Sequence, residues 1–337
     1  MYPMRVRKAY CIFALLLTIS DALRSQSAGG KCPQFAPEES IRKITPQDRI
    51  FRFDGGYVAV VNEVRLDTDG SPVAYHPRNK GTTDLCNGLD PIIDGTRETD
   101  KGTHSPCFAA VRAAINAEWR RDASPAFCVY GFYAPGTKTK QMPCNAWGGA
   151  FGKGEIPRQG PDDPAPGFFI STTATHNPGV FADDRQAKYL NSDRIPYAVV
   201  PRELVAQKLL PRTGIAWAWN PKSDRSAAGV FGDTQSKFGE ISVAFAQKLE
   251  QGELHVISPA AFAGASAIPW PYGRKKTGAI RLTHSPSAPV VFVYLSQSPT
   301  PALSTYDPEA IDTAVTRLLQ RFGGSDRLKE CVQPLLH

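Results

Sequence analysis

The sequence predicts a mainly β protein with a few helices at the margin of its sheets, the α+β class. Several short apolar runs, such as 57–61 and 290–295, are rich in β-branched and aromatic residues, which is typical of buried strands. Only a few stretches carry apolar residues at helical spacing. No glycine-rich nucleotide-binding loop follows a strand, so alternating β/α units are not expected.

The first strands are predicted in the N-terminal half. They are expected at 49–53, 57–61 and 63–66, and again at 167–173 after a long irregular segment. Between them, Phe108, Val111, Ile115 and Trp119 share one face of a predicted helix.

The C-terminal half predicts a strand at 195–201 with prolines at its margins. A hairpin with strands 215–219 and 228–231 follows, then a helix at 241–250 and a strand at 290–295. The last helix begins at Asp307 and Pro308, buries a stripe that includes Ile311 and Val315, and ends at Gly323.

The first 28 residues predict a secretory signal peptide. Arg5, Arg7 and Lys8 precede a short apolar run at 11–19, and small residues at 25–28 provide a cleavage site. A retained anchor is the alternative. Cleavage removes four basic residues and one acidic residue, so the formal charge falls from +7 to about +4. We expect a secreted or periplasmic monomer, residues 29–337, that binds no nucleic acid and, after signal removal, no membrane.

Six cysteines remain after cleavage, an even number that predicts three disulfides in an exported chain. Sequence alone cannot choose among the 15 pairings of six cysteines, but Cys32 and Cys331 lie near the two mature ends, so we expect a clasp between them. Residues 100–150 are interpreted as an insertion within a single domain. Their Gly, Pro and Thr content predicts that disulfides hold this segment in place of a core.

The chemical inventory favours carboxylates. No serine-nucleophile elbow occurs between a strand and a helix, and no two histidines have the spacing of a metal site. We therefore expect neither a metal nor a cofactor. Asp233 and Glu240 stand at the two ends of a short loop between a predicted strand and the helix at 241–250. This pair predicts two catalytic carboxyl groups, whereas an ordinary turn followed by an acidic first helical turn is the structural alternative.

A second acidic turn contains Asp67 and Asp69. It lacks the remaining ligands of a calcium loop, so it is either a plain hairpin turn or a site for a sugar or an amine. Tyr75 and His76 follow closely and are expected to line the same cleft, and Trp217 is a candidate for stacking on a sugar ring.

Four segments, in order, resemble the family 75 glycoside hydrolases, the fungal-type endo-chitosanases, and especially their bacterial members. They are residues 63–70 with 74–77, 164–173, 189–190 with 195–201, and 231–233 with 239–246. The resemblance covers about residues 50–90 and 155–258 and does not include the insertion. It implies a double-psi β-barrel-like core and an inverting hydrolase whose acidic pair, by motif match, is Asp233 and Glu240.

The predicted function is therefore endo-acting hydrolysis of β-1,4 bonds in chitosan or a related amino-sugar polysaccharide. If Glu240 opens a helix, the helix dipole favours its ionised form, which predicts Glu240 as base and Asp233 as acid. The alternative functions are a non-catalytic carbohydrate- or wall-binding module and an exported, toxin-like interaction protein whose working part is the insertion.

Overall fold

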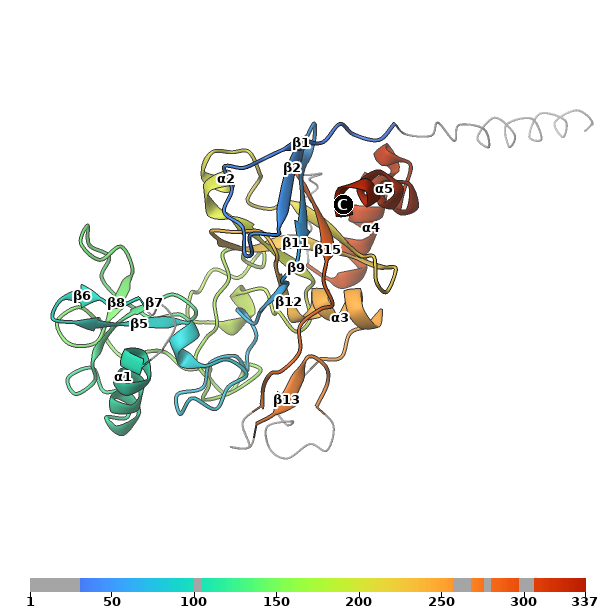
Figure 1. Ribbon diagram of the computed structural model, residues 1–337. Coiled ribbons are helices and arrows are strands. Elements are labelled where there is room, and N and C mark those ends of the chain that lie inside the picture. Colours follow the sequence, from blue (N-terminus) through green and yellow to red (C-terminus); the bar gives the residue numbers. More distant parts are fainter. Residues whose placement is uncertain (1–30, 100–104, 257–267, 276–279, 297–305) are drawn as a thin grey trace, which may run out of the picture.

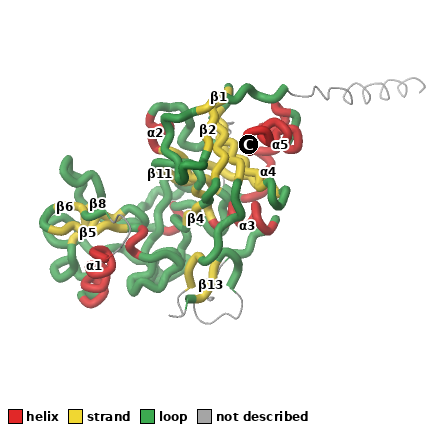
Figure 2. Tube along the Cα trace, in the orientation of Figure 1, coloured by secondary structure: helices red, strands yellow, loops and turns green. Residues whose placement is uncertain are grey.

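The computed structural model describes residues 31–99, 105–256, 268–275, 280–296 and 306–337, so the expected signal peptide lies outside the described residues. These ranges contain a nine-stranded sheet, a separate four-stranded sheet and a two-stranded ribbon, β13 (Tyr272–Arg274) with β14 (Ile280–Leu282). The two larger sheets lie at opposite ends of the molecule (Figure 1). Most of the chain between them forms loops, which are green in Figure 2. The protein is mainly β, as the sequence predicts.

The nine-stranded sheet is mixed, and its central strands are the apolar runs of the sequence. The strands β3 (Gly56–Val61), β15 (Val290–Leu295) and β10 (Ile215–Asn220) are antiparallel neighbours and are buried along their whole length. The expected hairpin is confirmed, because β10 pairs with β11 (Arg225–Gln235). The full order is β1 (Ala36–Pro37), β2 (Arg49–Phe53), β3, β15, β10, β11, β9 (Tyr197–Pro201), β12 (Glu240–Ser242) and β4 (Arg65–Asp67).

Helices cover both faces of this sheet. On one face, α4 (Pro308–Leu319) and α5 (Ser325–Val332) bury residues such as Ile311 and Val315 against the alternate side chains of β3, β10 and β15. On the other face, α3 (Val243–Gln251) packs Phe245 and Leu249 against the remaining ones. The predicted start of α4 is confirmed, because the Asp307 side chain accepts hydrogen bonds from two backbone N–H groups of the first turn.

The double-psi barrel implied by the resemblance is not seen as a closed barrel. Within the described strands, the hydrogen-bonded order has two ends, β1 and β4, that do not pair with each other. Strand direction nevertheless changes at the end of the sheet near the site, because β9 runs parallel to β11 and antiparallel to β12.

The second sheet contains the expected insertion but begins before residue 100. Its order is β6 (Thr96–Arg97), β5 (Leu89–Ile93), β7 (Ala126–Val129) and β8 (Asn145–Trp147), and α1 (Ser105–Asn116) packs beside it. We call this unit the satellite sheet. The prediction that it lacks a core is wrong, because Trp119, Phe127 and Trp147 are buried together within it. Of the helix face predicted there, Val111 is buried and Phe108 is 38% exposed, whereas Trp119 is buried but lies beyond the end of α1 at Asn116.

Three disulfides are present, as predicted. Cys32, near the start of the described residues, is bonded to Cys331 in α5, which confirms the expected clasp. The other two, Cys86–Cys107 and Cys128–Cys144, both hold the satellite sheet. Disulfides of this kind are typical of exported proteins.

The strand predicted at 167–173 is not among the described strands. Only isolated bridges occur there, at Phe169 and Ser171. The cause is that this segment bonds to side chains and loops rather than to a ladder. The Ser171 N–H donates to the Gln186 side chain, and the Phe169 N–H donates to the Tyr75 carbonyl.

Candidate active site

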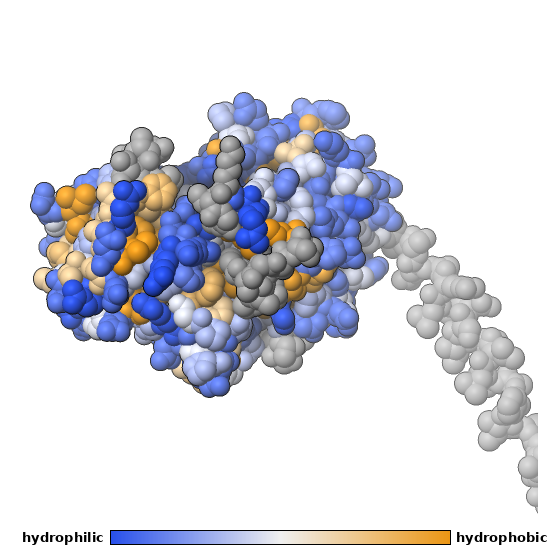
Figure 3. Space-filling view, turned by 90° about the horizontal axis from the view of Figure 1, so that it is seen from below, coloured by the Kyte–Doolittle hydropathy of each residue, from blue (hydrophilic) through white to orange (hydrophobic). Residues whose placement is uncertain are grey.

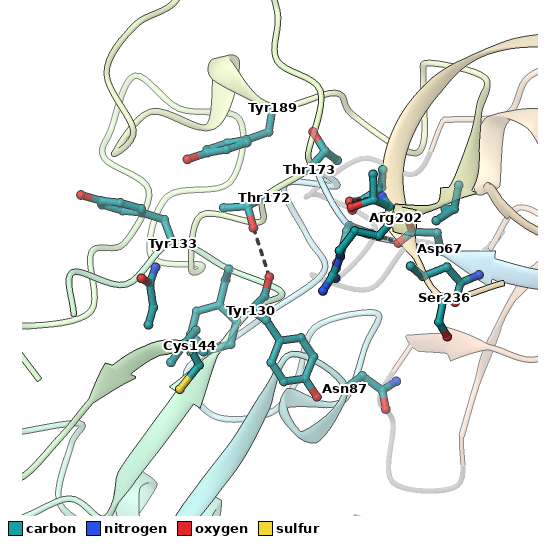
Figure 4. A pocket seen from close by; sticks show the side chains of 18 of the residues that line it. Asp67, Asn87, Tyr130, Tyr133, Cys144, Thr172, Thr173, Tyr189, Arg202 and Ser236 are labelled. Carbon is teal, nitrogen blue, oxygen red and sulfur yellow. Dashed lines mark hydrogen bonds between the residues drawn. The ribbon is translucent and has the colours of Figure 1, made fainter. Parts of the chain in front are cut away.

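A cleft of about 990 Å³ lies between the acidic end of the large sheet and the satellite sheet. Figure 4 shows Asp67, Arg202 and Ser236 on one side of it and Tyr130, Tyr133 and Cys144 on the other. Six acidic side chains and only three lysines or arginines line the cleft, although the whole chain has a formal charge of +7. The cleft is therefore an acidic region on a basic protein.

The large sheet places Asp233 and Glu240 on either side of one residue. In register, Asp233 lies opposite Val199 of β9. On the other side of β9, Ile241 lies opposite Ala198, so the preceding Glu240 is also next to Val199. Two strand spacings separate the two acidic residues, which puts their backbones about 9.5 Å apart.

A β-bulge turns Asp233 toward the cleft. Phe231 pairs with Ala198 and Asp233 with the next residue, Val199, so Gly232 is the extra residue of the bulge. Phe231 and Asp233 therefore point to opposite faces although they are two positions apart. Only glycine fits at the bulge, because a Cβ on Gly232 would lie 2.3 Å from Cγ of Tyr197.

Glu240 lies in a strand, and the expectation that it opens a helix is wrong. Helix α3 begins at Val243, and Ser242 is its N-cap, with the Ser242 Oγ accepting from the Phe245 N–H at 3.1 Å. Glu240 belongs to β12, where Ile241 faces the core, so Glu240 faces the cleft. The helix dipole therefore does not act on Glu240, and the role assignment based on it loses its support.

The acidic turn of Asp67 and Asp69 adjoins this pair. Asp67 pairs in register with Ser242 on the far side of β12, and its Oδ1 accepts from the Asp69 N–H at 2.8 Å. The Tyr75 hydroxyl donates to Asp69 Oδ1 at 2.7 Å. All four carboxylates line the cleft, so the structure brings the two predicted acidic segments together.

Burial raises the pKa of both Asp233 and Glu240. The pKa of Asp233 rises to about 8 because of burial and the Asp67 charge, against the opposing effect of the backbone N–H groups of Thr234 and Ala174. The pKa of Glu240 also rises to about 8, because of burial and then the charges of Asp67 and Asp233.

The neighbouring turn shows the same effect. Burial raises the pKa of Asp67 to about 6, and burial together with the charges of Asp67 and Asp233 raises that of Asp69 well above its usual range. Close carboxyl groups of this kind share protons. At neutral pH the cluster therefore holds both protonated and ionised carboxyl groups, which is what general acid–base catalysis requires.

The remaining predicted site residues do not line the cleft. Trp217 is 2% exposed and packs in the core beneath α4, because it alternates inward on a central strand. His76 is half-buried and packs edge-on against Phe168, with ring centroids 4.7 Å apart. Tyr75 is also buried, at 2% exposure, so it holds Asp69 in place rather than meeting a ligand directly.

Sequence reasoning missed two residues that line the cleft, Arg202 and Tyr130, and one buried residue that supports it. The buried residue is Tyr197, which donates a hydrogen bond to the Asp69 carbonyl at 2.7 Å and packs against the bulge at Gly232. Arg202 follows β9 and lowers the pKa of Asp233 by its charge. Tyr130 follows β7 on the satellite sheet. The position of Arg202 directly after a predicted strand was a usable signal; Tyr197 had been interpreted only as part of an apolar strand.

Comparison of the sequence with protein-family models finds no match, and comparison with curated proteins finds no similar sequence. The family resemblance therefore stays a prediction that depends on the motifs themselves. Among the described residues, no helix has the length and apolar character needed to cross a membrane. In the same ranges, no three His, Cys, Asp or Glu side chains are placed to share a metal ion.

Proposed function

We propose that the protein is an endo-acting glycoside hydrolase that cleaves β-1,4 bonds of chitosan or a related amino-sugar polysaccharide, with Asp233 and Glu240 as its two catalytic carboxyl groups. One observation carries the proposal. The two acidic side chains flank Val199 on the cleft face of the sheet, with backbones about 9.5 Å apart. An inverting pair needs its two carboxyl groups far enough apart to hold a water molecule beside the sugar, and two side chains that leave one sheet face from positions two strands apart support such an arrangement.

The hydrogen bonds favour Asp233 as the base and Glu240 as the acid. Asp233 Oδ1 accepts from the Thr234 N–H at 2.6 Å and from the Ala174 N–H at 3.2 Å, and such donors stabilise a carboxylate. The Asp67 charge raises the pKa of both groups, and the Asp233 charge further favours the protonated form of Glu240. In this mechanism Glu240 protonates the glycosidic oxygen, and Asp233 removes a proton from the attacking water. The order is the reverse of the helix-dipole prediction.

The acidic cleft supports an amino-sugar substrate. Each free glucosamine unit has an amino group that becomes an ammonium group in mildly acidic solution, and six carboxyl side chains line the cleft. Opposite charges attract more strongly in a partly buried cleft than in bulk water. We also propose that the fold is a relative of the double-psi barrel that is open at one side. The change of strand direction around β9 supports this, as does the succession of the bulged strand β11, the short strand β12 and the helix α3.

Release of reducing ends tests the proposal. The full mature chain is incubated with chitosan, chitin, cellulose and peptidoglycan, and NMR records the anomer released first. We expect cleavage of chitosan with inversion, and a loss of about 100-fold or more in turnover for Asp233→Asn and for Glu240→Gln. Glu155→Gln, on an exposed loop outside the cleft, is the matched control. Near-full activity in either cleft variant refutes the pair, and glycan binding without cleavage favours the carbohydrate-binding alternative.

A further inference from the structure

The satellite sheet forms one wall of the cleft, and a tyrosine stands exposed on that wall. Tyr130 directly follows β7 and is 47% exposed, although it lines the cleft. The face of the molecule in Figure 3 is mostly hydrophilic, with apolar residues in small groups. Tyr130 is thus a solvent-exposed aromatic ring in a cleft lined by six acidic side chains.

The Tyr130 side chain is held in place before any ligand binds. The Arg97 guanidinium lies over the ring, 5.6 Å from its centroid, and Arg97 Nε donates to Asp90 Oδ2 at 2.6 Å. The Tyr130 hydroxyl is 3.4 Å from the other oxygen of Asp90, which is itself buried on β5. With Arg97 over one face of the ring, the exposed area of Tyr130 is available to a ligand in the cleft.

A close backbone contact fixes this wall relative to the acidic cluster. The Tyr75 ring lies against Gly88 and Gly131, where an added Cβ would lie 2.8 Å and 2.4 Å, respectively, from ring or hydroxyl atoms of Tyr75. The same hydroxyl donates to Asp69. Tyr130 precedes Gly131 in the chain, and its backbone N–H donates to the Gly88 carbonyl. These contacts hold the Tyr130 backbone in a fixed position relative to the carboxylates.

We propose that Tyr130 is a substrate-binding residue whose ring stacks on a pyranose unit of the bound amino-sugar chain, so that the satellite sheet contributes to substrate choice. The inference rests on the proposed function. The ring offers a rigid apolar face that matches the C–H face of a sugar, while its hydroxyl is directed at Asp90. Because Tyr130 directly follows a strand of the satellite sheet whereas Asp233 and Glu240 lie on strands of the large sheet, we assign Tyr130 to binding rather than to the chemical step.

Calorimetry with a glucosamine hexasaccharide tests the inference. The Glu240→Gln variant of the full mature chain prevents turnover, and Tyr130→Ala and Tyr130→Phe are added to it. We expect Tyr130→Ala to weaken binding about tenfold and Tyr130→Phe to bind as the parent does. Phe181→Ala removes a ring that is 88% exposed outside the cleft and is the matched control. In the active chain, Tyr130→Ala should raise KM and leave kcat unchanged.

The outcomes separate this inference from the proposed function. Equal binding by Tyr130→Ala and its parent overturns the stacking role, whether or not the active chain hydrolyses chitosan. An equal loss in Tyr130→Phe assigns the effect to the hydroxyl and also overturns it. Tyr130-dependent binding by a wild-type chain that releases no reducing ends supports the stacking role and refutes hydrolysis. The thermal unfolding midpoint of each variant is compared with that of its parent, to distinguish a loss of binding from a loss of folded protein.

Discussion

Replacing Glu240 by glutamine should make the protein more stable at neutral pH while abolishing its proposed activity. The pKa of Glu240 is raised from 4.5 to about 8 in the fold. A carboxyl group with a raised pKa contributes stability that is fully present below the unfolded value, about pH 4.5. That stability is lost as the pH rises toward 8, because the unfolded chain ionises first. Glutamine resembles the protonated form and has no such loss.

The size of the effect follows from the same pKa difference. Each unit of pKa is worth about 1.4 kcal/mol, so the loss between pH 4.5 and pH 7 has an upper limit of about 3 kcal/mol. Glu240 keeps some exposure to the cleft and shares its protons with Asp67 and Asp233, which take up part of the change. We therefore expect Glu240→Gln to raise the free energy of unfolding at pH 7 by about 1–3 kcal/mol relative to wild type.

Urea unfolding of both proteins from pH 4 to pH 8 measures this difference. It should be small at pH 4 and should grow steadily above pH 5. The exposed Glu155→Gln variant should stay within about 0.5 kcal/mol of wild type at every pH. A difference that does not depend on pH, or a Glu240→Gln variant that is less stable at pH 7, would show that Glu240 is not the buried, protonated group described above.

Two further predictions concern the framework of the site. Gly232→Ala should lower the free energy of unfolding by about 1–3 kcal/mol through overpacking against Tyr197, and it should reduce turnover because Asp233, the next residue, shifts. Gly160→Ala is the control, since an added Cβ there has no neighbour closer than 3.9 Å, and it should have neither effect. Equal activity of the two variants contradicts the bulge argument. Replacing both Cys32 and Cys331 by serine should lower the free energy of unfolding by about 2–5 kcal/mol with unchanged activity per folded molecule, and an unchanged urea midpoint would refute a stabilising clasp.

Much of the large sheet could be predicted because its central strands are read from local pattern alone. The unbroken apolar runs at 57–61 and 290–295 are wholly buried strands, and the capped start of the last helix lies at Asp307. The segment at 167–173 has a similar composition but forms only isolated bridges. Its partners are the Gln186 side chain and distant loops, and such long-range bonds leave no periodic signal in the sequence.

The acidic residues of the candidate site could be predicted from the sequence, but their geometry could not. Asp233, Glu240, Asp67 and Asp69 all line one cleft, although the two acidic segments are far apart in the chain. The sequence could not show that Glu240 lies in a strand, because Ile241 and Ala244 fit a helical period equally well. The strand extends to Ser242 because β12 pairs with β4 and β9. Trp217 shows the opposite error, since an aromatic residue on a central strand has the core as its usual place.

The charge distribution joins the acidic cluster to the proposed substrate. In the free protein, burial and mutual repulsion keep Asp233, Glu240 and Asp69 partly protonated. An ammonium group placed among them lowers their pKa values by its charge, so binding of a glucosamine unit would release protons from the cluster. The substrate itself would then help to form the ionised base, while a neutral glycan such as cellulose would leave the cluster partly protonated, as it is in the free protein. A basic protein can in this way favour a cationic polymer, because the selection is made by the local charge of the cleft and not by the charge of the whole chain.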